Sequence, residues 1–415
     1  MSEGAARPRD SQSEIHAGFI PLVDCAPLVI AKELGFDAEQ NFALFLHRDV
    51  SWANIRDKVE AGVLDCAIML APMPLASTLG LGGRRAVPLI AAMSTNLNGN
   101  AITVSRALYD EMLKADRASA VAGGMESAKS LASVVAKRRI EGAEPLTLGM
   151  VYPFSSHNYD LRYWLAAAGI DPDNDVNLVV VPPPLIAGSL KAGRIDGFCV
   201  GEPWNSVAVA EGNGVIVATK PELWVASPEK VLGLKLEFPE RYPELTLKLI
   251  RALTMACAWL DSRENRLTAA EILAKPSYVG ISKELLLRVL TDDMKRGTGA
   301  TEPATTDAVI FHKNGANFPW VSHASWILTQ MIRWGQVRAP FDITEVARRV
   351  YRPDLYRDAV RSLGLQTPDD DVRREFGAAF FGGETFDPAM PLDYLRRLSM
   401  RDRTVDLTLF DEQAR

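Results

Sequence analysis

Two short stretches decide the fold: "EAGVLDCAIMLAPMP" at residues 60–74 and "KAGRIDGFCVGEPWN" at residues 191–205. Each reads as the end of a helix, an Ala-Gly stop, an aspartate, a buried strand and a proline-bearing loop. Gly62 and Gly193 are suited to helix C-caps, because glycine adopts the left-handed conformation there without strain. The aspartate three residues after each glycine opens the strand. This match predicts two related structural units in one chain.

The surrounding sequence repeats the same order of elements. Residues 17–70 alternate short β-rich runs such as "AGFIPL" and "FALFLH" with helical patterns such as "WANIRDKVEAG". Residues 146–203 follow the same plan, beginning with "LTLGMVYPF" and "NYDLRYWLAAAGI". Strands that alternate with helices in this way are typical of βαβ units around a mainly parallel sheet. From about residue 236 the pattern changes to long helices, and then to a turn-rich acidic tail.

We therefore predict an α/β fold of two parallel-sheet lobes with a hinge, an interlobe cleft and a helical C-terminal extension. At 415 residues the chain is long enough for more than one core. Ligands of open α/β sheets bind beyond the carboxyl ends of the parallel strands, so the cleft is the expected binding site. The predicted parts are a disordered segment (1–15), lobe 1 with a helical part (16–105 and 217–340), lobe 2 (106–216) and a C-terminal arm packed on the body (341–415).

The composition excludes several classes of protein. The net charge of −6 gives no basic surface for nucleic acid. The four cysteines are far apart in the sequence and form no Cys-x-x-Cys pair, so neither a disulfide framework nor a zinc site is expected. No apolar run reaches the roughly 18 residues of a membrane span, and the polar N-terminus lacks the apolar region of a secretory signal. A cytoplasmic location is therefore expected.

The loops that follow the predicted strands are rich in Trp, Asn, Gly and hydroxyl residues and contain few carboxylates. Such an inventory of hydrogen-bond donors is suited to a small anion. Helix N-termini add backbone N–H groups and a favourable dipole, and Ser51-Trp52 and Ser156-His157-Asn158 both precede helical patterns. A positive charge beside the anion would offset the cost of its desolvation. His157 or Lys230 could supply that charge.

Each of these residues also has a plainer interpretation. His157 would be an ordinary helix cap, Trp52 a core residue and Lys230 a surface lysine. Glu202 could be a general base, but "GEPW" also reads as a helix start at which an acid complements the dipole. No nucleophile with a base, no Gly-x-Ser-x-Gly motif and no Gly-x-x-x-x-Gly-Lys phosphate loop is found. We therefore expect binding without catalysis, and neither a metal nor a cofactor.

Several of the loop motifs, taken together, resemble a known family. They include "GFIPLVDCAPLVIAKELGF", "LNGNAIT", "SSHNYDLRYWLAAAGI", "GFCVGEPWN" and "SPEKVLG". From about residue 16 to about residue 400, the chain is similar to the nitrate- and bicarbonate-binding proteins of cyanobacterial-type ABC transporters. The resemblance implies a two-lobed periplasmic-binding-protein-like fold of type II. It also implies a set of ligand-binding residues: Trp52, Asn100, His157, Pro183, Gly201 and Lys230.

One position departs from that resemblance. The nitrate-binding members read Asn-Gly-Gln before "AIT", whereas this chain has Asn98, Gly99 and Asn100. Asn is one methylene shorter than Gln. The amide at this position therefore has a shorter reach than the family pattern implies.

The polar N-terminus favours a cytoplasmic relative over an exported receptor. The chain resembles the nitrate sensor of the NasS–NasT system, which holds an RNA-binding antiterminator inactive until nitrate or nitrite binds. This resemblance implies nitrate or nitrite as the ligand and a NasT-like antiterminator as the partner, with no direct contact to nucleic acid or membrane. One alternative is the substrate-binding component of a nitrate or bicarbonate ABC transporter. Another is an enzyme that makes the thiamine pyrimidine, which is disfavoured because its cysteine-rich "CCCFC" run is absent.

Overall fold

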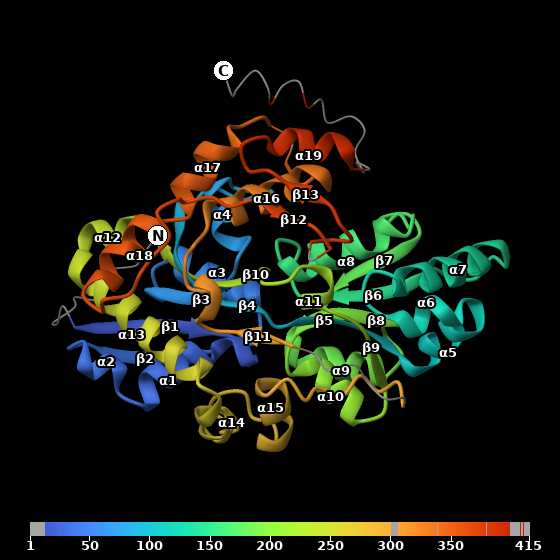
Figure 1. Ribbon diagram of the computed structural model, residues 1–415, viewed down its shortest axis with the longest axis horizontal. Helices are drawn as coiled ribbons and strands as arrows, with labels where there is room; N and C mark the ends of the chain where they lie inside the picture. The colour runs from blue at the N-terminus through green and yellow to red at the C-terminus, as the bar shows by residue number, and fades with distance from the viewer. Residues whose placement is uncertain are drawn as a thin grey trace, which may run out of the picture.

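The computed structural model describes residues 13–299, 306–337, 339–378, 380–398, 407 and 410. These residues form two α/β lobes side by side, with the C-terminal helices lying across them at the top of Figure 1. Within the described residues, one lobe is built on a six-stranded sheet and the other on a five-stranded sheet. The predicted two-lobed α/β fold is confirmed.

The sheet of lobe 1 is mixed. β1, β2 and β3 are parallel to one another, whereas β10 runs antiparallel to β3 and β4 and lies between them. In spatial order its strands are β11 (Val309–Ile310), β4 (Leu89–Asn98), β10 (Pro228–Lys235), β3 (Cys66–Leu70), β1 (Glu14–Phe19) and β2 (Ala43–Arg48).

The sheet of lobe 2 has the same design. β6, β7 and β8 are parallel, and β5 runs antiparallel between β8 and β9. Its strands are, in spatial order, β7 (Val176–Val180), β6 (Leu146–Met150), β8 (Gly197–Gly201), β5 (Asn100–Ser105) and β9 (Gly214–Thr219). In each sheet the antiparallel strand arrives directly from the other lobe. The mainly parallel sheet predicted for each lobe is found in β1, β2 and β3 and in β6, β7 and β8, whereas the exchanged strands β10 and β5 run antiparallel to their neighbours.

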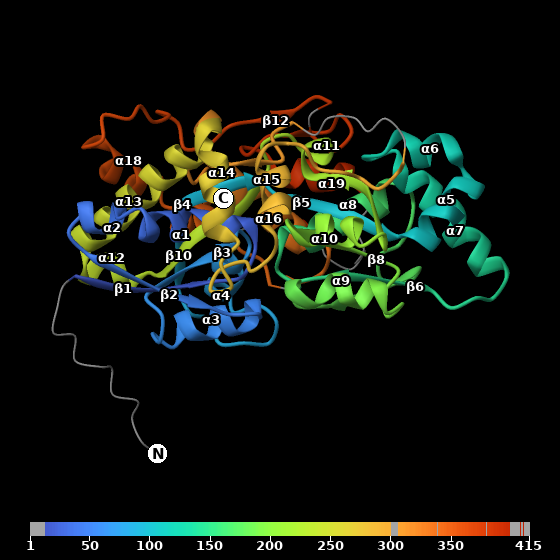
Figure 2. The ribbon, with the colours of Figure 1, turned by 90° about the horizontal axis from the view of Figure 1, so that it is seen from below.

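Helices cover both faces of the sheets. In lobe 1, α13 and α3 lie on opposite sides of the sheet (Figure 2). The helices before the C-terminal region are α1 (Ala26–Glu33), α2 (Phe36–Glu39), α3 (Trp52–Glu60), α4 (Met73–Thr78), α5 (Arg106–Ala115), α6 (Arg117–Ala122), α7 (Ser127–Ile140), α8 (Ser156–Ala167), α9 (Pro183–Lys191), α10 (Trp204–Ala210), α11 (Lys220–Leu223), α12 (Glu237–Arg241), α13 (Pro243–Asp261), α14 (Arg266–Leu273) and α15 (Lys283–Leu290). In the part of the chain that the structure describes, no helix is long and apolar enough to cross a membrane.

The repeated stretch folds alike in both lobes. Its two glycines have positive φ values of 71° and 66°, as helix C-caps require. The Asp65 Oδ2 atom accepts a hydrogen bond from the backbone N–H of His16 at 2.8 Å, and the Asp196 Oδ2 atom accepts one from Thr147 at 2.8 Å. Each aspartate thereby ties the start of one strand to its parallel neighbour, β3 to β1 and β8 to β6. The repeat in sequence is thus also a repeat in hydrogen bonding.

The C-terminal region lies on both lobes. Its helices are α16 (Val321–Arg333), α17 (Ile343–Val350), α18 (Pro353–Arg361) and α19 (Pro391–Arg397), with a small sheet of β12 (Glu375–Phe376) and β13 (Thr385–Phe386). α17 packs on α4 and β4 of lobe 1, and α18 packs on α13. Toward lobe 2, the Phe381 ring stacks on Tyr163 of α8 with ring centroids 4.0 Å apart. The Phe381 backbone N–H donates to the carbonyl oxygen of Leu223.

The lobe boundaries differ from the predicted ones. The prediction places residues 100–105 in lobe 1, but β5 pairs with β8 and β9 of lobe 2. It also places residues 217–219 in lobe 1, where the structure has the end of β9. A βαβ pattern gives no signal for strands that cross between lobes. At the N-terminus, Glu14 and Ile15 are paired in β1 rather than disordered, and residues 1–12 of the predicted disordered segment lie outside the described residues.

We predict that Asp65→Ala destabilises the fold by about 1–3 kcal/mol, because the partly buried backbone N–H of His16 loses its acceptor. Urea denaturation followed by circular dichroism measures the change. Asp110→Ala, which removes an exposed carboxylate on α5, is the control and should change stability by less than about 0.5 kcal/mol. Equal effects of the two substitutions would contradict the role given to Asp65.

Candidate functional site

Two crossovers of the chain meet between the lobes. The first runs from β4 to β5 through Asn98 and Gly99, whose φ values are 61° and 100°. The second runs from β9 to β10 and includes Ser227. The backbone N–H of Asn98 donates to the Ser227 carbonyl at 2.9 Å, and the Ser227 N–H donates to Asn98 Oδ1 at 3.0 Å. The start of β5 and the start of β10 are therefore held close together.

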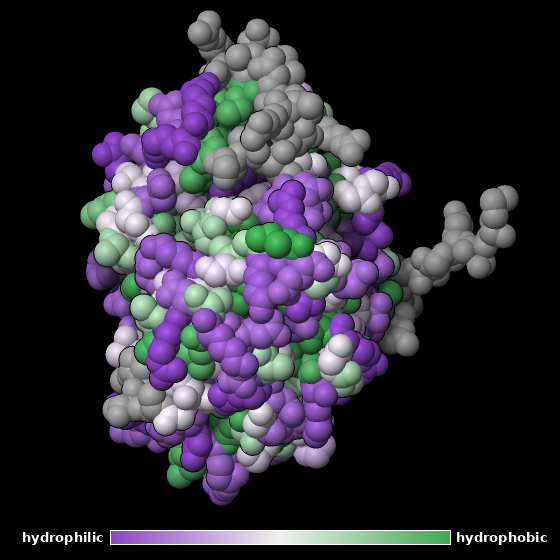
Figure 3. Space-filling view, turned by 90° about the vertical axis from the view of Figure 1, so that its right-hand side faces the viewer, coloured by the Kyte–Doolittle hydropathy of each residue, from purple (hydrophilic) through white to green (hydrophobic). Residues whose placement is uncertain are grey.

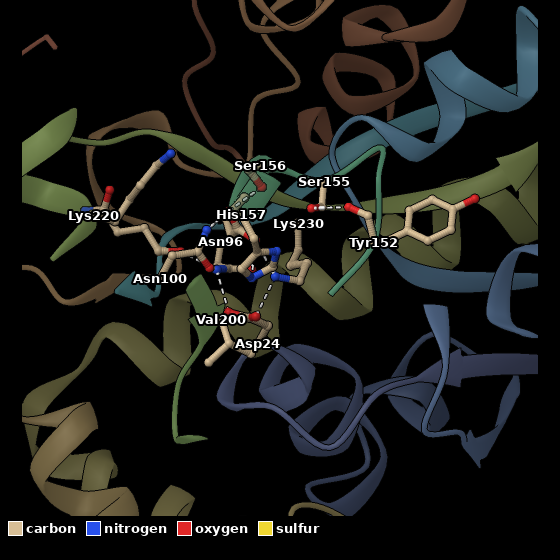
Figure 4. A network of polar contacts seen from close by, with 12 residues as sticks. Asp24, Asn96, Asn100, Tyr152, Ser155, Ser156, His157, Val200, Lys220 and Lys230 are labelled. Atoms are coloured by element: carbon tan, nitrogen blue, oxygen red, sulfur yellow. Dashed lines mark hydrogen bonds and ion pairs between the residues drawn. The ribbon is translucent and has the colours of Figure 1, made fainter. Parts of the chain in front are cut away.

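A group of polar side chains from both lobes is buried beside these crossovers (Figure 4). Each side chain belongs to a residue that is at most 4% exposed, and hydrogen bonds or ion pairs connect them. We call this group the interlobe cluster; its members are Asp24, Asn96, Asn100, Ser156, His157, Asp160, Lys220, Glu229 and Lys230. Asp24, Asn96, Glu229 and Lys230 come from elements of lobe 1, and the others from β5, α8 and α11.

Lys230 is the central cation of the interlobe cluster. Its Nζ atom lies 2.7 Å from Asp24 Oδ2 and 2.6 Å from Glu229 Oε1. Burial opposes the charge on Lys230, but the two carboxylates outweigh it and raise the pKa of the ammonium. The same ammonium lies 5.6 Å from the centroid of the Trp52 ring, within the range of a cation–π contact. Lys230 is thus charged and buried, and the interpretation as a surface lysine is wrong.

His157 lies in the first turn of α8 and is 0% exposed. The helix is capped by Ser155, whose Oγ accepts from the Asn158 N–H at 3.1 Å, so His157 is not the cap. Burial lowers the pKa of His157 to about 3, and the ring is neutral near pH 7. The His157 Nε2 atom lies 3.5 Å from Glu229 Oε1. A carboxylate repels a lone pair, which favours the tautomer with its proton on Nε2.

Asn100 is oriented by two carboxylates. Its Nδ2 atom donates to Glu229 Oε2 at 2.5 Å and lies 3.3 Å from Asp160 Oδ2. Asp160 is in turn paired with Lys220. Carboxylate oxygens accept hydrogen bonds, so the amide nitrogen must face them and the Oδ1 atom of Asn100 points elsewhere. Asn100 Oδ1 is a buried atom without a hydrogen-bond partner in the described residues.

Gly201 ends β8 next to this group. A Cβ atom at Gly201 would lie 3.0 Å from Asp24 Oδ2, 3.6 Å from Asn100 Oδ1 and 3.6 Å from His157 Nε2. The missing side chain therefore leaves a position that three polar atoms from both lobes face. An atom of a small ligand at this position would be within hydrogen-bonding reach of Asp24 and close to the other two.

Trp52 and Pro183 complete the predicted set of site residues. Trp52 is the first residue of α3, is 2% exposed, and its Nε1 atom is a buried donor without a hydrogen-bond partner in the described residues. Pro183 is the first residue of α9 and is buried. Its role in ligand binding rests on the resemblance alone. The structure thus groups Trp52, Asn100, His157, Gly201 and Lys230 at one place, as their contacts above show.

The structure adds several acidic residues that the sequence analysis did not expect. Asp24, Asp160 and Glu229 belong to the interlobe cluster, and Glu202 borders it. Burial raises the pKa of Asp24 to about 6 and that of Glu202 to about 7, and it also raises the pKa of Asp160. Burial opposes ionisation of Glu229 as well, but attraction by Lys230 prevails and lowers its pKa to about 2. The expectation that the site contains few carboxylates is therefore wrong.

A sequence signal for these acids does exist. Asp24 lies in the loop after β1, one of the loops expected to border the binding site, and Glu229 directly precedes Lys230. Adjacent residues of a strand point to opposite faces in a regular sheet. This rule argues against a shared site for Glu229 and Lys230. β10 is irregular at this point, because its register with β4 shifts between Pro228 and Val231.

Two hollows on the described surface are lined by charged residues that are not buried. One is lined by residues of α7 and the turn before β6, including Arg138 and Arg139, and another by Glu384, Asp387 and Arg397 of the C-terminal region. The face of lobe 2 in Figure 3 is mostly hydrophilic, with hydrophobic residues scattered over it. The interlobe cluster is therefore the candidate functional site.

We predict that Gly201→Ala lowers affinity for the ligand roughly 100-fold, or about 2.7 kcal/mol, because the methyl group occupies the position that the polar atoms face. Gly201 has no positive φ, so the fold should persist, and isothermal titration calorimetry with thermal denaturation checks both points. Gly188→Ala is the matched control, since an added Cβ there meets nothing within 4 Å. Normal affinity in the Gly201 variant would place the ligand elsewhere.

The model of the NMT1-like family matches residues 9–274 of the chain. Among curated proteins, the chain is 41% identical to the nitrate import ATP-binding protein NrtC of Synechocystis over 95% of its length, and spans 57% of that relative. The chain thus covers little more than half of the first relatives it matches. It is also 33% identical to the nitrate/nitrite binding protein NrtA of Synechococcus elongatus, over 92% of this chain and 86% of that protein.

Solved structures agree with these sequence relationships. The crystal structure of the periplasmic nitrate-binding protein NrtA from Synechocystis superposes with a TM-score of 0.86 at 30% identity, covering 94% of this chain and 99% of that one. A ligand-binding component of an ABC-type import system from Staphylococcus aureus, at 15% identity, shares the fold with a TM-score of 0.64. The periplasmic-binding-protein-like fold implied by the sequence is confirmed. The chain belongs to the NMT1-like family and is a homologue of the NrtA nitrate-binding proteins.

Proposed function

We propose that this chain binds nitrate or nitrite in the interlobe cluster. The observation that carries the proposal is the group of N–H donors there: a buried, charged Lys230, the neutral ring of His157 and the Trp52 Nε1–H. A small planar anion accepts hydrogen bonds from several directions, and a cation beside it offsets the cost of desolvation. NrtA relatives, which are named for binding nitrate and nitrite, match nearly the whole chain.

We further propose that the chain acts as a substrate-binding component of an ABC transporter. Two lobes joined by crossovers, with the ligand between them, support hinge closure around the ion. The solved relative with a TM-score of 0.86 is described as periplasmic, and the NrtC and NrtA relatives are named for nitrate import or for binding nitrate and nitrite. A binding role without catalysis agrees with the character of the NrtA relatives.

The hypothesis of a cytoplasmic sensor has less support. It rests on the resemblance of the sequence to the NasS–NasT system. The relatives named above are import or binding proteins, and none of those names refers to an antiterminator. The transport role therefore comes first, with a NasT-like partner as the competing hypothesis.

Titration calorimetry with nitrate, nitrite and hydrogencarbonate tests the ligand. His157→Ala should weaken binding of nitrate about 10- to 100-fold, because a donor to a charged ligand contributes about 1.5–3 kcal/mol. The control is His47→Ala, which removes an exposed histidine on β2. Because burial holds the pKa of His157 near 3, the ring stays neutral and its ionisation adds no pH dependence between pH 5 and 8. A wild-type protein that binds only hydrogencarbonate would refute the assignment.

The transport and sensor roles are separated by a second experiment. The transport proposal predicts that the liganded protein raises ATP hydrolysis by the cognate permease complex in proteoliposomes. The sensor hypothesis predicts that an antiterminator co-purifies with the ligand-free protein and is released by nitrate. Cell fractionation decides the compartment. Stimulation of ATP hydrolysis in the absence of any released partner would leave only the transport role.

A further inference from the structure

The buried charges of the interlobe region do not balance. Lys220 is paired with Asp160, and Lys230 is shared between Glu229 and Asp24. Glu202 is also buried, and its Oε2 atom accepts from the backbone N–H of Ser206. Two lysines thus face four carboxylates, while His157 is neutral. When all four acids are ionised, the region carries an excess of negative charge before an anion enters.

Asp24 is the carboxylate that faces the position of the ligand. The point where a Gly201 Cβ would lie is 3.0 Å from Asp24 Oδ2. An anion bound there brings a negative charge close to an ionised carboxylate, out of contact with water. Two like charges at this distance in a buried site repel each other strongly. A proton on one of the acids removes the repulsion.

The position of Asp24 beside the ligand, together with the hydrogen bonds of Glu229, selects Asp24 among the acids. Glu229 accepts hydrogen bonds from Lys230 Nζ, Asn100 Nδ2 and the hydroxyl of Ser156. All three stabilise its ionised form. Asp160 forms an ion pair with Lys220, and Asn100 Nδ2 lies 3.3 Å from Asp160 Oδ2. The Oδ1 atom of Asp24 accepts from Asn96 Nδ2 at 2.9 Å, whereas its Oδ2 atom meets Lys230 and the position of the ligand.

Building on the proposed function, we propose that Asp24 takes up one proton from solvent when the anion binds. The proton adds to Oδ2, which keeps a lone pair for Lys230, and the new O–H donates to the anion. No other bond forms or breaks. The anion and the proton enter together, so the net charge of the buried region is unchanged. Asp24 thereby acts as a positioning residue for Lys230 in the free protein and as a hydrogen-bond donor in the complex.

The groups around Asp24 are consistent with uptake of a proton when the anion binds. The titratable groups that interact with Asp24 are Lys230 and Glu229 of β10, Glu202 after β8 and the adjacent Cys25, and His157 of α8 faces the same position beside Gly201. Burial already raises the pKa of Asp24 to about 6, with attraction by Lys230 opposing the rise and repulsion by Glu229 adding to it. A bound anion adds further repulsion and raises the pKa again.

The direction of the pH effect follows from linkage. A group whose pKa rises on binding takes up protons, so affinity is highest below the pKa of the free protein. Affinity then falls as the pH rises through the pKa of the complex. The pKa of His157 in the free protein, about 3, lies well below that of Asp24, so a bound anion must raise it much further before the ring takes up a proton in this range.

Calorimetry of nitrate and nitrite binding at pH 7, in PIPES and in Tris, measures the proton count, since the two buffers release different heats on ionisation. The wild-type protein should take up a proton, at most one per anion, and its affinity should fall up to tenfold per pH unit over the window of uptake. Asp24→Asn should reduce the uptake to near zero and flatten the pH profile. Glu202→Gln should retain the uptake. Infrared difference spectra of wild-type protein labelled at aspartate carboxyls should show a protonated carboxyl band on binding.

The outcomes are distinguishable. Binding of nitrate without proton uptake by the wild-type protein, and without the carboxyl band, overturns the role of Asp24 but leaves the proposed function intact. If proton uptake is lost in Glu202→Gln and kept in Asp24→Asn, the proton binds Glu202, and the role of Asp24 is again overturned. No binding of nitrate or nitrite at any pH ends both proposals. If Asp24→Asn does not fold, the aspartate band of the wild-type protein decides alone.

Discussion

One buried ammonium group is the constraint on which the arrangement of the lobes depends. Lys230 lies on β10, the strand that leaves lobe 2 and inserts between β3 and β4 of lobe 1. An ammonium ion is costly to remove from water unless acceptors surround it. Asp24 and Glu229 supply them, and Glu229 is in turn held by Asn100 and Ser156 of lobe 2. These hydrogen bonds are complete only when the two lobes lie together.

The C-terminal region and the interlobe cluster share two helices. α8 begins with cluster residues and continues to Tyr163, whose ring stacks on Phe381. α11 begins with Lys220, whose Nζ atom lies 5.9 Å from the ring centroids of Trp224 and Phe381. Side chains in a closely packed interior do not move independently. A rotation of lobe 2 that opens the cluster must therefore also rearrange these aromatic contacts.

The local sequence is sufficient to predict the repeated core of each lobe. The helix stops at Gly62 and Gly193 need only a residue that tolerates positive φ, and Asp65 and Asp196 each reach a backbone N–H of the adjacent strand. These interactions depend on neighbours within one βαβ unit. The exchanged strands β5 and β10 depend on contacts with the other lobe, which no local pattern contains. That is why the predicted lobe boundaries are wrong and why the sequence does not predict these two antiparallel strands.

The site shows the same division. The sequence by itself determined that Trp52, His157 and Lys230 are candidates for binding an anion, because their residue types and family motifs are visible in the chain. Only the tertiary structure decided which of them are charged. Burial makes His157 neutral, whereas Lys230 stays charged because Asp24 and Glu229, about 200 residues apart in sequence, meet at its ammonium. A pKa depends on desolvation and on the charges nearby, and both arise only when the lobes pack together.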